Sequence, residues 1–236
     1  MPSEREVERI ESVYAYYDAA GDVQRRRDRA NPGNIRIARE RDAAMEKLLL
    51  RRLTRSLEEC RVLEIGCGRG DFLAWLNGLG VAESGLVGVD LLADRIESAR
   101  RALPKMQFIQ GNAEELQLPD SSFDLVLCIT LFSSILDRGM SRNVAATVDR
   151  VLRPSGAVLW YDFRYRNPSN PHTRAMPRSA VSELFPTYQV QLQSTTLLPQ
   201  LARRLGPLVR VFYPALSALP PLRTHYVGLL EKPAAG

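Results

Sequence analysis

A glycine-rich turn offers the clearest binding chemistry in the sequence. Residues 64–70 read Glu-Ile-Gly-Cys-Gly-Arg-Gly. An apolar run at 62–65 precedes the turn, and residues 71–76 begin a helical pattern. Glycine has no Cβ, so such a turn lets backbone N–H groups and a helix N-terminus approach a ligand closely. This strand–turn–helix arrangement predicts a ligand site at the end of the strand.

Asp90 is the second residue with a distinct chemistry. It ends the next apolar run, Gly88-Val89-Asp90, 20 residues beyond Gly70. A carboxylate at this place can accept hydrogen bonds from both hydroxyls of a nucleoside ribose. The alternative is that Asp90 only caps the helix that begins at Leu92. Its distance from the glycine turn favours the ribose role.

The elements that must position these residues alternate from residue 61 onward. Short apolar runs at 61–65, 86–89, 106–110, 124–130 and 156–163 are typical of buried strands. The segments between them at 70–79, 92–103 and 141–152 have helical spacing. Strands that alternate with helices predict an α/β fold with a parallel sheet and right-handed crossovers.

The two ends of the chain have a different pattern. Helical spacing at 5–18 and 35–57 predicts an N-terminal helical cap over residues 1–58. Residues 190–198 and 224–232 are typical of two further strands, and 199–217 could form one or two amphipathic helices between them. We therefore expect one α/β domain over 59–236, with an insertion at about 199–222.

The bulk composition is that of a soluble globular protein. The chain has 236 residues, a hydrophobic content of 45% and a charged content of 25%. No apolar run is long enough to cross a bilayer, and the charged start MPSEREVERIES lacks a secretion signal, so we expect a cytoplasmic protein. Three cysteines without a C-x-x-C pair and two histidines predict neither a disulfide framework nor a metal site.

Four segments together resemble the motifs of class I S-adenosylmethionine-dependent methyltransferases. The turn at 64–70 is similar to their first motif, E/D-x-G-x-G-x-G, and 111–115 with 118–124 is similar to their third and fourth. Leu152-Arg153-Pro154-Ser155-Gly156 resembles the turn before their fifth strand. The resemblance covers about 60–165 and implies a Rossmann-like fold with a seven-stranded, mostly parallel sheet flanked by helices. Dehydrogenases that bind NAD would need glycine at position 71, where Asp71 stands.

The resemblance also implies roles for individual residues around S-adenosylmethionine. Gly66, Cys67 (through its backbone) and Gly68 would wrap the methionine part, and Glu64 would orient its ammonium group through water. Asp90 would hold the ribose. The remaining contacts would come from Leu91 packing on the adenine, Asn112 and the Ala113 amide at the adenine edge, and a carbonyl of Ile129 or Cys128 at the ammonium. Tyr14, Tyr17 and Arg36 could form a lid, although aromatic residues at helical spacing are more often core residues.

Candidate general bases follow the fifth strand. An alcohol acceptor must lose a proton, whereas a neutral amine need not. Asp162 ends that strand and His172 lies in the loop beyond it, at the edge where open α/β sheets bind ligands. Related enzymes often carry His-His after the fourth strand, where this chain has Ser133-Ser134. His225 lies within an expected strand, which favours a structural role.

The acceptor is predicted from weaker signals. The last third of the chain resembles bacterial methyltransferases encoded with polysaccharide and lipopolysaccharide assembly enzymes, which implies O-methylation of a sugar or glycoconjugate hydroxyl in polysaccharide biosynthesis. Arg203, Arg204 and Arg210 would then face a phosphate or, as a peripheral contact, an anionic membrane surface. A soluble secondary metabolite as O- or N-acceptor, and a non-catalytic cofactor-binding protein, remain alternatives. The net charge of +5 raises nucleic acid as a third partner, but no aromatic residues interleave with the arginines.

Overall fold

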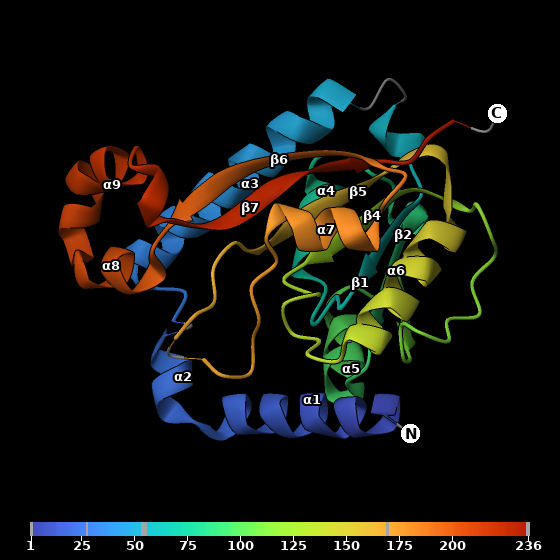
Figure 1. Ribbon diagram of the computed structural model, residues 1–236, viewed down its shortest axis with the longest axis horizontal. Helices are drawn as coiled ribbons and strands as arrows, with labels where there is room; N and C mark the ends of the chain where they lie inside the picture. Colours follow the sequence, from blue (N-terminus) through green and yellow to red (C-terminus); the bar gives the residue numbers. More distant parts are fainter. Residues whose placement is uncertain (1, 27, 53–55, 169, 235–236) are drawn as a thin grey trace.

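A seven-stranded sheet forms the centre of the computed structural model, which describes residues 2–26, 28–52, 56–168 and 170–234 (Figure 1). The strands are β1 (Val62–Ile65), β2 (Leu86–Asp90), β3 (Gln107–Gln110), β4 (Phe123–Ile129), β5 (Leu152–Phe163), β6 (Gln189–Leu197) and β7 (Arg223–Glu231). Their order across the sheet is β3-β2-β1-β4-β5-β7-β6. The first five strands pair in parallel, and β7 runs antiparallel to both β5 and β6. This confirms the predicted seven-stranded, mostly parallel sheet.

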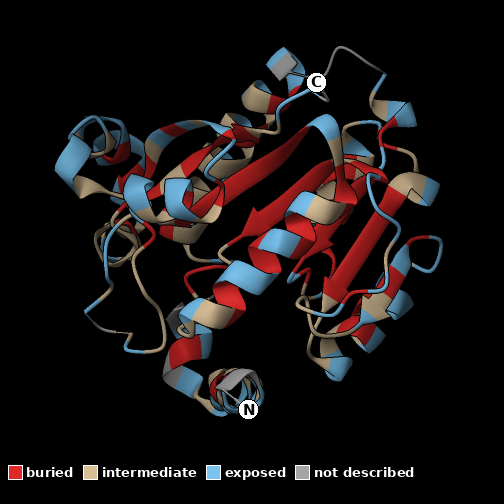
Figure 2. Cartoon of the chain, turned by 45° about the vertical axis from the view of Figure 1, so that its right-hand side comes forward, coloured by how far each residue is buried: buried red, intermediate tan, exposed pale blue. Residues whose placement is uncertain are grey.

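Helices cover both faces of the sheet, so the central strands are buried (Figure 2). One face packs against α6 (Arg138–Val151) and α7 (Arg178–Leu184), and stacked rings of Phe132 and Trp160 lie 5.1 Å apart within that core. The other face packs against α3 (Pro32–Arg52), α4 (Asp71–Gly78) and α5 (Ala93–Ala102). Burial on both sides explains why the strand segments are continuous apolar runs.

The N-terminal segment divides into helices with different neighbours. α1 (Pro2–Ala19) packs against α6, and α2 (Gly21–Arg26) turns the chain toward α3. α3 instead lies along β6 and β7 and contributes the buried side chains of Met45 and Leu49 to the core of the domain. The helical spacing at 5–18 thus corresponds to α1. The spacing at 35–57 corresponds to α3 as far as Arg52, and residues 53–55 of that prediction lie outside the described residues. α2 and α7 were not predicted. The division of the chain into a cap at 1–58 and a domain at 59–236 stays a prediction.

Two short helices connect β6 to β7. They are α8 (Pro199–Arg204) and α9 (Val209–Ser217), flanked by single turns of tighter helix at Gly206–Leu208 and Pro220–Leu222. α8 approaches α3 so closely that a Cβ on Gly33 would lie 2.3 Å from the carbonyl oxygen of Ala202. Glycine at position 33 therefore permits this contact. Among the described residues, no helix has both the length and the apolar character needed to cross a membrane.

Candidate cofactor and acceptor site

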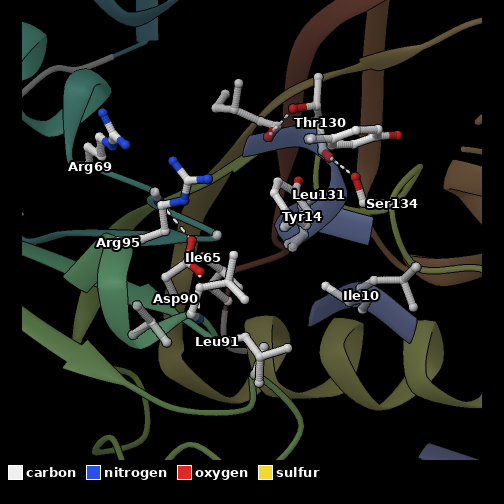
Figure 3. Close-up of a pocket in the computed structure, with 18 of the residues that line it drawn as sticks. Ile10, Tyr14, Ile65, Arg69, Asp90, Leu91, Arg95, Thr130, Leu131 and Ser134 are labelled. Carbon is white, nitrogen blue, oxygen red and sulfur yellow. Dashed lines mark hydrogen bonds between the residues drawn. The ribbon is translucent and has the colours of Figure 1, made fainter. Parts of the chain in front are cut away.

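A cavity of about 770 Å³ lies at the carboxyl ends of β1, β2 and β4, where open parallel sheets bind ligands. α1 passes over it, so that Ile10 and Tyr14 lie beside Leu131 and Ser134, while Asp90 lies on the other side of the space (Figure 3). Of the predicted cofactor residues, the cavity is lined by Gly66, Gly68, Asp90, Leu91, Asn112, Ala113 and Ile129. Glu64 and Cys67 do not line it, and both are buried.

The glycine turn adopts backbone conformations that favour glycine. Gly66, Gly68 and Gly70 have φ angles of 76°, 54° and 81°, all in the left-handed region. The carbonyl of Val89 accepts hydrogen bonds from the amides of both Gly66 and Cys67, at 2.8 and 3.0 Å. These bonds tie the turn to β2. The turn is therefore held in place by two of its own amides. Because Gly66 and Gly68 line the cavity without a Cβ, a ligand can approach the backbone there closely.

Asp90 joins the glycine turn to the start of α5. Its Oδ2 accepts a hydrogen bond from the amide of Gly68 at 2.8 Å, and its Oδ1 accepts one from the amide of Leu92 at 2.9 Å. Burial raises the pKa of this carboxyl, and the two amide bonds oppose that shift. Both roles considered for Asp90 are thus compatible with its position: it holds Leu92 at the start of the helix and also faces the cavity.

Glu64 is a buried carboxyl without a full set of partners. Glu64 is only 2% exposed, and its Oε2 has no hydrogen-bond partner among the residues that the structure describes. Burial raises its pKa well above the usual range, and the charges of Asp90 and Asp71 raise it further. A cation placed in the cavity would relieve this repulsion. The unpaired oxygen and the surrounding carboxylates therefore fit the ammonium group of S-adenosylmethionine.

The residues predicted to contact adenine follow β3 and line the cavity. The side chain of Asn112 is held by Glu114, because its Oδ1 accepts a hydrogen bond from the Glu114 amide at 3.1 Å. The preceding amide, that of Gly111, donates to the carbonyl of Asp90 at 3.0 Å. This links the loop after β3 to the residue predicted to hold the ribose. The roles of Asn112 and Ala113 in reading adenine stay predictions.

A strained residue shapes the loop after β4. Thr130 has a φ of 51°, which is unusual for a β-branched residue and marks a position that its surroundings hold in place. Its amide donates to the carbonyl of Tyr161 at 2.6 Å, and its own carbonyl accepts from the Ser134 hydroxyl at 3.0 Å (Figure 3). The result is a tight loop that turns Leu131 and Ile135 toward the cavity. No pattern in the sequence indicates this strain.

Neither candidate base lines the cavity. Asp162 is fully buried, and its oxygens accept hydrogen bonds from the amides of Ser133 and Phe163 at 2.9 and 2.7 Å. It thereby holds the loop after β4, and burial raises its pKa to about 6. His172 lies across α1 from the cavity, with its ring centroid 6.3 Å from that of Tyr17. The structure does not bring Asp162 and His172 together, and their roles as bases stay predictions.

Ion pairs missed by the sequence reasoning fasten the N-terminal segment over the cavity. Arg95 of α5 pairs with Asp18 of α1, and Arg29 pairs with Asp71 at the start of α4. All four of these residues line the cavity. A charge pair between segments far apart in sequence has no local pattern, so only the fold could reveal it. Tyr14 and Tyr17 line the cavity as a lid would, whereas Arg36 lies over the ring of Tyr213, away from it.

The comparisons with known proteins agree with this geometry. Residues 62–156 match a family described as a methyltransferase domain. The fold and this match define the class of protein that the chain resembles: residues 62–156 are similar to a methyltransferase domain, and the fold is that of solved S-adenosylmethionine-dependent methyltransferases. A solved S-adenosylmethionine-dependent methyltransferase from Methanosarcina mazei superposes with a TM-score of 0.59 and 19% identity over 79% of this chain and 97% of its own. The 4+2 cyclase SpnF superposes equally well, at 16% identity over 82% and 81%.

The curated relatives share only part of their length with this chain. A phthiotriol/phenolphthiotriol dimycocerosates methyltransferase of Mycobacterium ulcerans is 37% identical over 118 residues, which is 47% of this chain and 39% of the relative. The fatty-acid O-methyltransferase of Mycolicibacterium smegmatis is 38% identical over 113 residues, with the same coverage. The matched region thus spans about two-fifths of each relative.

Proposed function

We propose that the chain transfers the methyl group of S-adenosylmethionine to an oxygen of an acceptor that has a lipid-like, apolar part. The observation that carries the proposal is one wall of the cavity, which is formed by residues of α1, of the loop after β4 and of α6. That wall is apolar and is lined by Ile10, Leu131, Ile135, Met140 and Val144. An apolar wall favours an apolar ligand because contact removes both surfaces from water.

The two halves of the cavity would have different tasks. When bound, the cofactor supplies an electrophilic methyl group on a positively charged sulfur. Asp90 would hold the ribose, the glycine turn would wrap the methionine part, and Glu64 would orient the ammonium group. Thr130 and Ser134 would fix the loop that carries the acceptor wall, while α1 would exclude water from above. Positioning of two reactants in this way supplies much of the acceleration of a displacement reaction.

The identity of the acceptor is the finer part of the proposal. The named relatives act on phthiotriol dimycocerosates and on fatty acids, both of which contain long apolar chains. The glycoconjugate hydroxyl predicted from the sequence would suit the same wall if the glycan carries a lipid. A free nucleotide sugar would leave the apolar wall without a contact. A fatty-acid carboxylate would be methylated without a general base, because it is already ionised near neutral pH.

The predicted bases can be tested within this proposal. His172 could act on a hydroxyl only if Tyr14 and Tyr17, which lie between it and the cavity, allowed a path. His172→Gln should then lower kcat for alcohol acceptors and leave kcat for carboxylate acceptors unchanged. If both classes of acceptor are methylated at native rates by this variant, His172 is not the base.

The decisive experiment measures transfer of labelled methyl groups to a panel of acceptors. The panel contains fatty acids, long-chain alcohols, a glycolipid, a nucleotide sugar, and small phenols and amines. We expect transfer to lipid-bearing acceptors and none to the nucleotide sugar. The opposite pattern would refute the lipid-like acceptor, and cofactor binding without transfer to any acceptor would favour a non-catalytic cofactor-binding protein.

A matched pair of variants on α1 tests the wall itself. Ile10 and Val7 are both half-buried against the same core, but only Ile10 lines the cavity. Ile10→Ala should raise KM for an apolar acceptor about tenfold, since removing methyl and methylene groups costs about 1–2 kcal/mol of contact. Val7→Ala should leave KM unchanged, and neither variant should alter the Kd of the cofactor. Equal effects of the two variants on KM would contradict the assignment of the wall.

A further inference from the structure

α9 lies at one end of the molecule, beyond β6 and β7 (Figure 1), and together with its neighbours in the chain it carries an exposed apolar surface. Four large side chains form this surface, which we call the α9 patch: Leu208, Val211, Phe212 and Leu219, exposed by 57, 70, 48 and 52%. They fall within twelve residues of the sequence. A short segment that exposes this much apolar surface is unusual in a monomeric soluble protein and marks an interaction site.

The α9 patch cannot be removed from water by turning α9 inward, because the inner face of the helix is already packed. Val209 and Tyr213, four residues apart, are buried against α8 and β6. The Tyr213 hydroxyl donates a 2.6 Å hydrogen bond to Glu40 of α3, and it also accepts one from the Leu197 amide at 3.3 Å. α9 is therefore apolar on both faces, and the fold fixes which face points outward.

The charged side chains within the segment that carries the α9 patch are all of one sign. Residues 184–230 contain no aspartate or glutamate. Arg204 and Arg210 are exposed, and in the part of the chain that the structure describes neither makes an ion pair. On the inner side of α9, Arg36 of α3 lies with its guanidinium 5.1 Å from the centre of the Tyr213 ring, beside Glu40. The surface thus combines exposed apolar side chains with unpaired positive charge.

We propose that the α9 patch docks onto the surface of an anionic lipid bilayer. Apolar side chains would enter the boundary between headgroups and acyl chains, and the arginines would meet the lipid phosphates. A second copy of the chain is a poorer occupant, because a twofold interface would bring two copies of the same positively charged surface together. The proposal does not depend on the methyl acceptor.

The position of the α9 patch in the fold relates it to the cavity. β6 is antiparallel to β7, which is antiparallel to β5, so β6 runs in the same direction as β5 and the other parallel strands. The segment that follows β6 therefore leaves the sheet at the carboxyl edge, where the cavity lies. α8 also contacts the start of α3, close to Arg29 at the cavity. Docking through α9 would hold this edge of the protein near the lipid.

Vesicle co-sedimentation of the full chain tests the proposal without cofactor or acceptor. The probes are vesicles of phosphatidylcholine alone and vesicles that also contain phosphatidylglycerol, at low and high salt. We expect binding to the anionic vesicles and its decrease at high salt. The double variant Val211→Glu with Phe212→Glu should weaken binding at least about tenfold, because it removes apolar contact and adds negative charge. Arg204→Gln with Arg210→Gln should weaken it about 30-fold, at about 1 kcal/mol for each arginine.

Leu50→Glu is the matched control, because Leu50 is 62% exposed on α3, near the helix end opposite to the α8 contact. It should bind vesicles like the native chain. Absence of binding by the native chain, or equal loss in Leu50→Glu, would overturn the proposal. So would a dimer in solution that Phe212→Glu converts to a monomer, since a second copy would then cover the patch. Because calorimetry with the cofactor is a separate measurement, failure here is distinguishable from failure of the proposed activity.

Discussion

Replacing Glu64 with glutamine should change protein stability and cofactor binding in opposite directions. The substitution keeps the shape of the side chain and removes its charge. In the free protein, burial and the charges of Asp90 and Asp71 raise the pKa of Glu64. For an acid whose pKa is raised by folding, the stabilising contribution is complete below the unfolded pKa, here 4.5, and is lost as the pH rises through the folded pKa. Glutamine carries no such loss, so Glu64→Gln should gain stability relative to the native chain as the pH rises above that value.

The effect on cofactor binding has the reverse sign. Through the water that is expected between them, the ammonium group of S-adenosylmethionine would interact with a carboxylate in the native chain and with a neutral amide in the variant. A hydrogen bond between charged groups contributes about 1.5–3 kcal/mol, against about 0.5–1.5 for a neutral one. The difference of about 1.4 kcal/mol corresponds to about tenfold weaker binding.

Two measurements check this pair of predictions. Urea unfolding at several pH values gives the free energy of unfolding of both proteins. Calorimetry gives the Kd of S-adenosylhomocysteine, which keeps the ammonium group, and of methylthioadenosine, which lacks the amino-acid portion. The variant should lose affinity only for the first ligand. Equal affinities of both proteins for S-adenosylhomocysteine, together with parallel stability curves, would refute the reasoning about Glu64.

Three further predictions concern other parts of the fold. Asp90→Ala should weaken cofactor binding about 100-fold in calorimetry, because two charge-assisted hydrogen bonds to the ribose hydroxyls contribute about 3 kcal/mol together. An unchanged Kd would leave Asp90 only its bonds to the Gly68 and Leu92 amides. Gly228→Ala should lower the free energy of unfolding by about 3 kcal/mol or more, because the new Cβ would lie 1.9 Å from the carbonyl oxygen of Gln191. Urea unfolding measures this loss, and a value below about 1 kcal/mol would contradict the prediction. Burial lowers the pKa of His225 from 6.5 to about 3, so its contribution to folding stability is complete above pH 6.5 and is lost as the pH falls toward 3. Between neutral pH and pH 4, His225→Phe should lose about 3 kcal/mol less free energy of unfolding than the native chain in thermal melts, and equal losses would contradict this.

The sequence was sufficient to predict the glycine turn and Asp90 as cavity residues, because this part of the site is built from local patterns. The glycine turn needs left-handed backbone at Gly66, Gly68 and Gly70, and only glycine adopts this without cost. Asp90 follows a buried strand at a fixed distance from that turn. Strand, turn and helix are contiguous in the chain, so their relative placement is set by neighbouring residues.

The apolar wall of the cavity could not be predicted from the sequence in the same way. Ile10 and Met140 meet at one cavity although 130 residues separate them, and no periodicity relates the two segments. The sequence also placed Asp162 and His172 at the correct edge of the sheet. It could not show that Asp162 would be turned inward to the Ser133 amide, since that depends on how the loop after β4 packs.

Residue order alone therefore determined the alternating strands and helices, the parallel sheet and the glycine turn, because each of these follows from short-range periodicity and from the backbone preferences of single residues. Tertiary packing decided the rest. It set α1 over the cavity through the Arg95–Asp18 pair, left Oε2 of Glu64 buried without a partner, and turned the second apolar face of α9 outward. These features depend on which distant surfaces meet, and the free energy of such contacts exists only once the chain has folded.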